Sequence, residues 1–249
     1  MSTRPTDLNI VKISNKPFGQ GYGCAVWKAK LQESGIVASL REAAILNKLD
    51  HPNVIEFIGT SFGHSNPPLP CIVLAFCDND NISNYLKRHT NPNRTQLVTQ
   101  ITAGLRYLHK IRVIHGDIKP VNILIDDAHQ ARISDFGSAR MEDDRSKSVT
   151  GTPRWMAPEL HEPYVDDPST SQASDVWAFA LTVLEIFTGL QPFHRIDREL
   201  TLILFLMGGG RPERDRYASL DETIWLSLEK CWEVDPAKRP SIHDPIVNI

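Results

Sequence analysis

The spacing of apolar residues changes at about residue 77. Before this point the chain consists mainly of short apolar runs with β-branched and aromatic residues, which predict strands. After it, apolar residues recur mostly at helical spacing, which predicts helices. The predicted fold class is therefore α+β, with a smaller strand-rich lobe over residues 10–77 and a larger, mainly helical lobe over residues 78–249.

One amphipathic helix is expected within the strand-rich lobe. Glu42, Ile45, Leu46 and Leu49 lie on one face of the segment 40–49, and Ser39 together with Glu42 has the form of a capping box. Because a buried carboxylate is costly without a partner, we expect Glu42 to face a cation.

Turn signals and periodicity place further elements along the chain. The predicted strands are Gly35–Ala38, Val54–Phe57 and Cys71–Phe76, and the predicted helices are Ile82–Arg88, Thr95–His109, Val176–Phe187, Asp197–Met207 and Asp221–Trp232. Ser174-Asp175 is expected to cap the most apolar of these helices, Val176–Phe187, and Gly189 is expected to end it.

Residues 115–122 form a polar loop between two short β-branched runs, which predict two small strands that hold the loop. Within it, Asp117 could accept a proton, Lys119 could neutralise a transferred anion, and Asn122 could ligate a hard cation through its amide oxygen. A solvated turn uses the same Gly and Pro residues, so these residues alone leave both interpretations open.

A glycine-rich stretch precedes the run that begins at Val26. Gly19, Gly21 and Gly23 follow one another at alternate positions. Glycine allows backbone N–H groups to approach a phosphate closely. A flexible hairpin tip uses the same residues, so this stretch alone is compatible with a phosphate loop and with a plain hairpin.

Composition and charge are typical of an intracellular globular protein. Hydrophobic residues make up 41% of the 249 residues and charged residues 23%, and the formal net charge of −3 gives no reason to expect nucleic acid or an anionic membrane as a partner. The four cysteines form no CxxC pair. We see no secretory signal and no apolar stretch long enough to span a bilayer, and expect a cytoplasmic or nuclear location.

Four motifs occur in the order found in one enzyme family. They are Gly19-x-Gly21, His115-Gly-Asp-Ile-Lys-Pro-Val-Asn122, Asp135-Phe-Gly137 and Ala157-Pro-Glu159. Over nearly its whole length the chain resembles a eukaryotic protein kinase domain. The run at 151–159 and the ending Asp235-Pro…Arg239-Pro240 are most similar to the tyrosine-kinase-like group, and Lys119 is the residue that serine/threonine kinases carry there.

The resemblance implies a bilobal kinase fold and a catalytic role for the polar loop. Asp117 would be the base that accepts the proton of the substrate hydroxyl, and Lys119 would steady the γ-phosphoryl group of ATP. Asn122 and Asp135 would hold Mg²⁺ ions, and Thr152 would order the substrate-binding segment beside Asp117. The implied reaction transfers the γ-phosphoryl group to serine or threonine hydroxyls of a protein substrate.

The resemblance also implies a nucleotide pocket and a structural ion pair. Leu74 would be the gatekeeper, and the Ala75–Cys77 backbone would be the hinge that meets adenine. The other residues implied to bind ATP are Gly19, Gly21, Gly23, Val26, Ala38 and Leu124. Glu159 and Arg239 would form a buried ion pair that stabilises the larger lobe.

Two departures from the family pattern concern the phosphate grip and regulation. The third glycine of the glycine-rich loop falls on Cys24, which predicts a looser grip. Gly116 replaces the arginine of the family's H-R-D motif, so a phosphorylated activation loop has no cation to dock on at that position. We therefore predict that phosphorylation of Ser146, Ser148 or Thr150 is not the main activating step.

A third departure removes a catalytic lysine. Leu40 stands where strand 3 of the family carries this lysine, and Glu42 follows after one residue instead of a longer linker. The strand end, the linker and the lysine are missing together, which indicates a deletion or a gene-model error rather than a point mutation. Alternation along the strand places Lys28 on the same face as Val26, so Lys28 is either a substitute or a solvated surface lysine.

Two functions follow from these features. The presence of Asp117, Lys119, Asn122 and Asp135 favours an active protein kinase. The missing lysine favours a pseudokinase, an ATP-binding or scaffolding module without turnover. Loss of one charge-stabilising contact typically costs about 10²–10³ in rate, so a slow enzyme is also compatible with the sequence. No motif indicates the substrate, the upstream activator or the oligomeric state.

Overall fold

The computed structural model describes residues 10–12, 19–21, 24–26, 29–31, 40–62, 70–144, 151–161 and 169–245. Several positions that the sequence analysis singles out lie outside these ranges, namely Gly23, Lys28, Ala38, Ser39, Ser146, Ser148 and Thr150. The predicted strand at Gly35–Ala38 also lies outside them.

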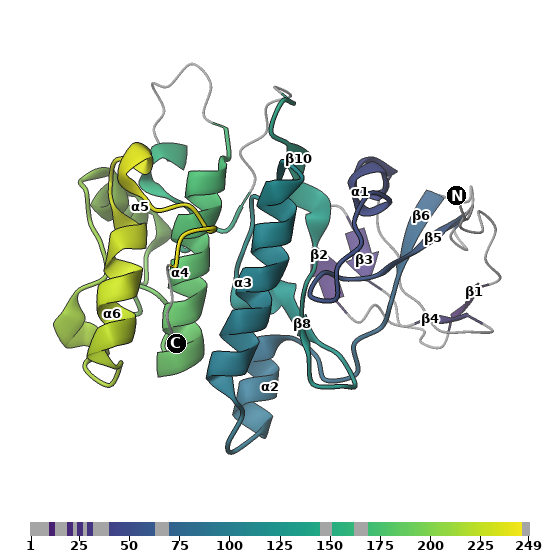
Figure 1. The fold of residues 1–249 in the computed structure, drawn as a ribbon, viewed down its shortest axis with the longest axis horizontal. Coiled ribbons are helices and arrows are strands. Elements are labelled where there is room, and N and C mark those ends of the chain that lie inside the picture. Colours follow the sequence, from purple (N-terminus) through teal and green to yellow (C-terminus); the bar gives the residue numbers. More distant parts are fainter. Residues whose placement is uncertain are drawn as a thin grey trace.

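Within the described residues, the strand-rich lobe contains three antiparallel strand pairs and one helix. β1 (Ile10–Lys12) pairs with β4 (Ala29–Leu31), β2 (Gly19–Gly21) with β3 (Cys24–Val26), and β5 (Phe57–Phe62) with β6 (Pro70–Leu74). The helix, α1 (Leu40–Leu46), contacts β5 and β6. Figure 1 shows these elements together on the right-hand side, next to the larger helices.

Helix α1 is shorter than the sequence predicts, but its predicted face is buried. The helix ends at Leu46 because the following turn is tighter: the N–H groups of Lys48 and Leu49 donate to carbonyls three residues earlier. Glu42 and Ile45 are each 8% exposed, and Leu46 and Leu49 are also buried. The buried face therefore continues through the turn, although the helix does not.

The segment before β5 connects the two lobes. The predicted strand at Val54–Phe57 is placed too early, because β5 begins only at Phe57. Val54 instead forms a bridge with Ile133 of the helical lobe, and the N–H of Ile55 donates to Ile133 O at 2.8 Å. The N–H of Ile133 donates to Asn53 O at 2.9 Å. The backbone of this segment is thus bound by a strand of the other lobe.

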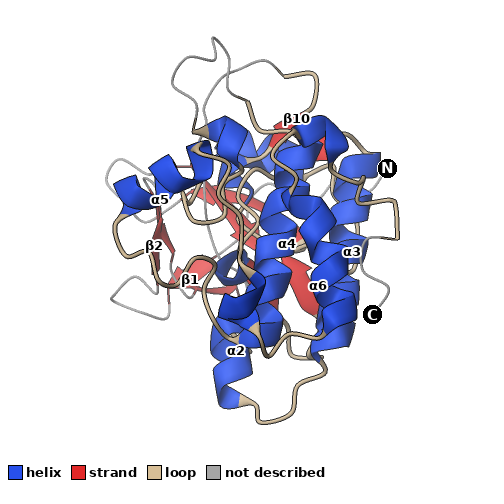
Figure 2. Cartoon of the chain, turned by 90° about the vertical axis from the view of Figure 1, so that its left-hand side faces the viewer, coloured by secondary structure: helices blue, strands red, loops and turns tan. Residues whose placement is uncertain are grey.

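The helical lobe is built around α3 (Arg94–Lys110) and α4 (Gln172–Thr188), which contact each other and lie side by side in Figure 1. Along α3, the apolar stripe is at most 3% exposed, as its spacing predicts; its members are Leu97, Ile101, Leu105 and Leu108. Further helices are α2 (Ile82–Arg88), α5 (Glu199–Met207) and α6 (Glu222–Glu229). In Figure 2 the helical lobe faces the viewer, with α4 and α6 in front of the strands. Among the described residues, no helix is both long enough and apolar enough to cross a membrane.

Four short strands and several 3₁₀ turns carry the polar loop and its neighbours. β7 (Val113–Ile114) pairs with β10 (Arg140–Met141), and β8 (Ile123–Ile125) pairs with β9 (Ala131–Ile133). The two strands that flank the loop are therefore each held by a later strand and do not pair with each other. Near the loop and the segment after it, the 3₁₀ turns of the described residues are Pro120–Asn122, Phe136–Ser138 and Pro158–Leu160. The others lie in the last part of the lobe, at Arg214–Tyr217, Lys230–Trp232 and Pro236–Lys238.

The start of α4 differs from its prediction. The N-cap is Ser171, whose Oγ accepts the N–H of Ser174, while Ser174 Oγ accepts the N–H of Ser171. This reciprocal capping box leaves Asp175 inside the helix, where it is 1% exposed. The predicted end is confirmed, since Gly189 has φ 72° and its N–H donates to Glu185 O at 2.8 Å.

The predicted ion pair between Glu159 and Arg239 is confirmed. Two bonds of 2.7 Å join Arg239 Nη1 to Glu159 Oε1 and Arg239 Nη2 to Glu159 Oε2. The Arg239 side chain is fully buried, and its guanidinium also donates to the carbonyls of Ala173 and Glu233 and lies 5.1 Å from the centre of the Trp177 ring. The pair thus joins the turn at 158–160 to α4 and to the last part of the lobe.

We expect Glu159→Ala to lower the free energy of unfolding by about 3–5 kcal/mol, because it leaves the buried Arg239 cation without its counter-ion. Urea denaturation followed by tryptophan fluorescence measures the change. Lys238→Ala is the control, since Lys238 and Asp235 lie 3.9 Å apart and are mostly exposed, and such pairs contribute about 0–1 kcal/mol. Equal losses in the two variants would contradict the assigned role of the buried pair.

Candidate functional site

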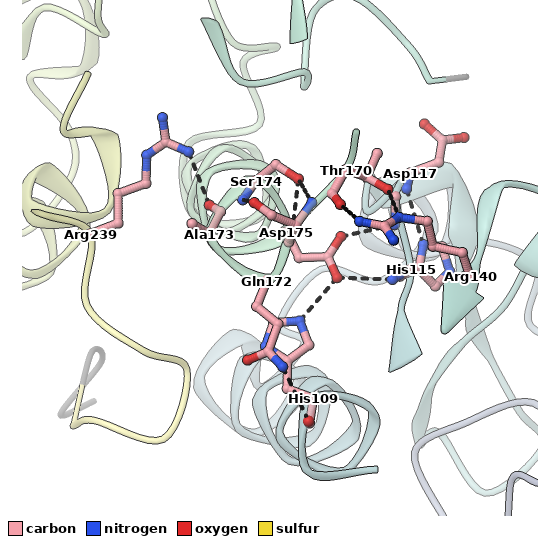
Figure 3. A network of polar contacts seen from close by, with 12 residues as sticks. His109, His115, Asp117, Arg140, Thr170, Gln172, Ala173, Ser174, Asp175 and Arg239 are labelled. Carbon is pink, nitrogen blue, oxygen red and sulfur yellow. Dashed lines mark hydrogen bonds and ion pairs between the residues drawn. The ribbon is translucent and has the colours of Figure 1, made fainter. Parts of the chain in front are cut away.

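The backbone of the polar loop is bound by a buried carboxylate of α4. Asp175 Oδ2 accepts the N–H of His115 and Asp175 Oδ1 accepts the N–H of Gly116, each at 2.9 Å (Figure 3). His109 Nε2 of α3 lies 2.9 Å from Asp175 Oδ2. Burial by itself raises the pKa of Asp175, but the hydrogen bond and the electrostatic interaction with His109, with smaller contributions from His115 and from the Gly116 N–H, outweigh it, so this pKa lies below its usual value. A charged Asp175 therefore fixes the start of the loop.

This role of Asp175 is not evident from the sequence, where the residue is expected to cap a helix. The sequence does indicate that Asp175 needs partners, because a carboxylate at the start of the most apolar helix requires buried hydrogen-bond donors. Those donors are 66, 60 and 59 residues away in the chain, so helical periodicity does not reveal them.

His115 connects the loop to the segment that contains Asp135. The side chain is fully buried, its Nε2 lies 3.0 Å from the carbonyl of Ser134, and its Nδ1 accepts the N–H of Asp117 at 3.2 Å. Since one ring nitrogen must accept and the other must donate, these contacts assign the neutral tautomer with hydrogen on Nε2. The ring also meets the edge of Phe136 at 5.0 Å between centroids. His115 is thus a structural link between the loop and the segment that contains Asp135.

Gly116 fits a space that a side chain would not fit. Its φ is +78°, and a Cβ atom at this position would lie 2.9 Å from Ser138 O and 3.3 Å from Thr170 Cγ2. Positive φ and close contacts both disfavour an L-residue with a side chain here. Gly116, which stands where the family has arginine, therefore lies at a point where three segments of the chain, at residues 116, 138 and 170, come close together.

The four residues assigned to catalysis lie together around the carboxylate of Asp117. Lys119 Nζ donates to Asp117 Oδ2 at 2.5 Å, and Asn122 Nδ2 donates to the same oxygen at 3.1 Å and to the Asp117 carbonyl at 2.8 Å. Both the N–H and the Oγ1 of Thr152 lie 3.2 Å from Asp117 Oδ1, and Thr152 Oγ1 also accepts a hydrogen bond from Lys119. The predicted proximity of Thr152 to Asp117 is confirmed.

This cluster suits proton transfer beside a developing negative charge. The side chains of Asp117 and Lys119 are 11% and 15% exposed, so they are shielded but still reach solvent. A fixed carboxylate with a neighbouring ammonium group can accept a proton and stabilise an anion without reorganising.

Asn122 and Asp135 provide the oxygens expected for a hard cation. Because Asn122 Nδ2 donates twice to Asp117, the amide is oriented, and the described residues provide no donor to its Oδ1. Asp135 is exposed, has φ 62°, and accepts the N–H of Gly137 at 3.4 Å. Asp135 is not bonded to the Asp117 cluster, but Ser134 donates both its N–H and its Oγ–H to Asn122 O at 2.8 Å, which places Asp135 next to Asn122 in the fold.

The described residues contain no group of three or more His, Cys, Asp or Glu side chains that could hold a metal ion. Mg²⁺ does not need such a group, because it is usually bound by one or two side-chain oxygens together with substrate phosphates and water. Asn122 and Asp135 are the right residue types for this mode of binding.

Helix α1 reaches the helical lobe through Glu42. Glu42 Oε1 accepts the N–H of Phe136 at 3.1 Å. Burial, and to a lesser extent the nearby charge of Asp135, raise the pKa of Glu42 to about 7, although the bond from Phe136 acts in the opposite direction. No cation among the described residues pairs with Glu42. Within the described residues, a backbone N–H therefore takes the place of the cationic partner expected from the sequence.

The residues implied to bind a nucleotide come from both lobes. The glycine-rich stretch is a β-hairpin, with Gly19 opposite Val26 and Gly21 opposite Cys24. Leu74 is the last residue of β6, and the N–H of the next residue, Ala75, donates to the carbonyl that precedes β5, at 2.9 Å.

The connector after Ala75 runs beside β8, so Cys77 and Leu124 belong to one region. The N–H of Asn79 donates to Ile125 O at 3.2 Å, and the N–H of Ile125 donates to Asp80 O at 2.8 Å. The Cys77 side chain is buried, and the part of the chain that the structure describes offers its backbone N–H no acceptor. This N–H is therefore available to a ligand.

Glu42 predicts a pH-dependent stability. A folded-state pKa of about 7 against 4.5 means that the folded state binds the proton more tightly. The protonated Glu42 side chain therefore stabilises the folded state fully below pH 4.5, and this contribution is lost as the pH rises through 7. The loss in the free energy of unfolding is at most about 3 kcal/mol. We expect Glu42→Gln to remove this dependence and to be more stable than wild type at pH 8. Urea midpoints at pH 5.5 and 8 measure it, and an unchanged pH dependence in the variant would contradict the assignment.

Comparison with protein families and curated proteins gives consistent matches. Residues 16–249 match the sequence model of the family described as protein tyrosine and serine/threonine kinase. The chain is 32% identical over 216 residues to serine/threonine-protein kinase STY17 and 30% identical over 210 residues to serine/threonine/tyrosine-protein kinase HT1, both of Arabidopsis thaliana. It is 30% identical over 220 residues to mitogen-activated protein kinase kinase kinase 12 of Rattus norvegicus.

These alignments cover most of this chain but only part of each relative. They include 83%, 82% and 86% of the chain, and 36%, 52% and 24% of the three relatives in the same order. The chain thus spans about half or less of the length of these curated relatives.

Proposed function

The chain belongs to the protein tyrosine and serine/threonine kinase family, and from this premise we propose that it is a protein serine/threonine kinase. It would transfer the γ-phosphoryl group of ATP to hydroxyl groups of a protein substrate. The observation that supports this proposal best is the Asp117 carboxylate, which is bonded to Lys119, Asn122 and Thr152 at once.

In the proposed reaction, the oxygen of the substrate hydroxyl bonds to the γ-phosphorus while the bond from that phosphorus to the departing ADP breaks, and Asp117 accepts the hydroxyl proton. Donors on both of its oxygens hold the carboxylate in one orientation. Lys119 Nζ contacts both Asp117 and Thr152, so its charge lies beside the base, where it stabilises the phosphoryl group during transfer. Thr152 joins the loop to the segment 151–161 and thereby orients the surface on which a substrate would lie.

We propose ATP and Mg²⁺ as the cofactors. Asn122 Oδ1 and the Asp135 carboxylate would hold the ion, which neutralises phosphate charge when bound. The free Cys77 N–H would bind adenine at the hinge, and the β2–β3 hairpin would lie over the phosphates. The other proposed nucleotide contacts are Gly19, Gly21, Val26, Leu74, Ala75 and Leu124, and Gly23 and Ala38 stay predictions outside the described residues.

The missing strand-3 lysine is expected to slow this enzyme. Leu40, which stands at the position of this lysine, is the first residue of α1, and Glu42 binds a backbone N–H. Leu40 therefore supplies no cation to contact Glu42 and the ATP phosphates. We expect a rate lower by about 10²–10³ than with that contact present. The comparisons do not support the pseudokinase alternative, since the matched relatives are described as kinases. Lys28 as a substitute stays a prediction outside the described residues.

We also propose an intracellular site of action, with a protein as the principal partner. Cys77 and Cys231 are free and buried, and burial raises the pKa of each thiol to about 12, so they are unreactive. Free buried thiols are compatible with the reducing compartment expected from the sequence. The net charge of −3 gives no basis for proposing a nucleic acid partner.

Transfer of labelled γ-phosphate to a generic protein substrate, with Mg²⁺ present, tests the proposed activity. We expect Asp117→Asn to reduce transfer by about 10²–10⁴, because an amide does not accept the hydroxyl proton. Asp127→Asn is the control, since Asp127 is exposed and lies outside the cluster. Equal transfer by wild type and Asp117→Asn would contradict the proposal, and a thermal-shift measurement with Mg–ATP would then separate a nucleotide-binding module from one that binds none.

Simultaneous replacement of Ser146, Ser148 and Thr150 by alanine is expected to leave the rate of transfer close to that of wild type. The reason is that Gly116 carries no cation on which a phosphorylated residue could dock. The same labelled-phosphate assay measures the outcome. Abolished transfer in the triple variant, with unchanged thermal stability, would show that phosphorylation of this segment is the activating step after all.

A further inference from the structure

Arg140 lies beside the catalytic loop and joins two separate segments of the chain. In β10 it pairs with Ile114, the residue just before the loop. Its Nε donates to Thr170 Oγ1 at 3.1 Å and its Nη2 donates to the carbonyl of Thr170, as Figure 3 shows. Its Nη1 donates to the carbonyl of Asp144 at 2.8 Å, and more weakly, at 3.3 Å, to those of Met141 and Glu142. One guanidinium thus binds the chain after Asp135–Gly137 to the residue before the N-cap of α4.

All acceptors of Arg140 are neutral oxygens. Among the described residues, no carboxylate forms an ion pair with it, and each of its three nitrogens already donates to a carbonyl or a hydroxyl. A phosphate group would have to displace several of these bonds in order to use the same nitrogens. The geometry therefore favours an internal role for this cation over the capture of a phosphate.

The loop packs closely against the two segments that Arg140 joins. A Cβ at Gly116 would lie 2.9 Å from Ser138 O and 3.3 Å from Thr170 Cγ2, so both segments meet the same face of Gly116. Thr170 is 3% exposed and precedes the helix whose Asp175 binds the N–H of Gly116. A displacement of Thr170 or of the chain at Ser138 would therefore change the packing around Gly116, next to the catalytic base.

We propose that Arg140 is a positioning residue that fixes the catalytic loop without a phosphate. It holds Thr170 and the chain from Ser138 to Asp144 against Gly116, and Asp117 follows directly. The role rests on the proposed kinase activity for its consequence in catalysis, but the contacts themselves can be tested without it. The arginine that the family carries at Gly116 is thus replaced by a cation from a neighbouring strand, which binds internal oxygens.

Arg140→Lys tests this role, because lysine keeps the charge but lacks the planar fork that reaches Thr170 and Asp144 together. Arg106→Lys is the matched control, since Arg106 also binds only carbonyls, those of Ile242 at 2.7 Å and Asp244 at 3.0 Å, away from the loop. Amide hydrogen exchange over residues 113–117, kcat and KM are measured for wild type and both variants, before and after phosphatase treatment.

We expect Arg140→Lys, but not Arg106→Lys, to speed exchange over residues 113–117 by about tenfold, as the loss of one or two net hydrogen bonds implies. We expect kcat to fall by a similar factor while KM for ATP changes little, because the base is displaced and the nucleotide contacts are not. Phosphatase treatment should leave wild-type exchange and kcat unchanged.

Equal exchange in the two variants would overturn the proposal. Faster exchange or a lower kcat of the wild-type protein after phosphatase treatment would also overturn it, because Arg140 would then act as a phosphate ligand. If Arg140→Lys does not fold, Thr170→Val replaces it, because this variant removes the Oγ1 acceptor and keeps the shape of the side chain. We expect Thr170→Val to show the same changes at smaller size, and unchanged exchange in this variant would also overturn the proposal. A wild-type protein that transfers no phosphate contradicts the proposed function, whereas the exchange data still decide the role of Arg140.

Discussion

The hydrogen bonds that Asp175 accepts are the constraint on which the proposed active site depends. A charged carboxylate that is 1% exposed is tolerated only because the N–H groups of His115 and Gly116 and the ring of His109 bind it. Separation of the loop from α4 would remove the two backbone donors and leave this buried charge with His109 as its remaining described partner, at a cost of about 3–5 kcal/mol. The position of Asp117 therefore follows from the helix that packs beneath it.

Further contacts extend this arrangement to the other lobe. His115 bonds to the carbonyl of Ser134, Ser134 bonds to the carbonyl of Asn122, and Glu42 of α1 accepts the N–H of Phe136. The proposed base, the proposed metal ligands and the helix of the smaller lobe are thus joined through backbone groups. Each such bond contributes only about 1 kcal/mol net, but each buried group left without its partner would cost more. The site is therefore expected to form or be lost as a unit.

The protein lacks two cations that its family pattern contains, and the structure shows what lies near each position. Glu42, which would meet the lysine of strand 3, is bonded to a backbone N–H, and its raised pKa makes that contact dependent on pH. Gly116 stands at the position of the missing arginine, and Arg140 binds Thr170, which packs against Gly116, and the chain at Asp144 through neutral oxygens. Neither arrangement needs an added phosphate. We therefore expect phosphoryl transfer that is slow and does not depend on phosphorylation of Ser146, Ser148 or Thr150, and a stability that falls as the pH rises toward 7.

The sequence by itself determined the features that depend on neighbouring residues. The stripe along α3 and the end of α4 at Gly189 were predicted and are confirmed, because periodicity and turn chemistry are local. The short motif likewise singled out the loop that contains Asp117, Lys119 and Asn122, whose catalytic roles stay predictions. Only the tertiary structure decided which distant groups meet. The partners of Asp175, the pairing of β7 with β10, the bridge from Val54 to Ile133 and the contact of Arg140 with Thr170 join positions that lie 26 to 79 residues apart. No local pattern specifies such a partner, because a buried polar group requires only that some suitable donor or acceptor be present. Which group takes that place is decided when the whole chain folds and brings distant residues together.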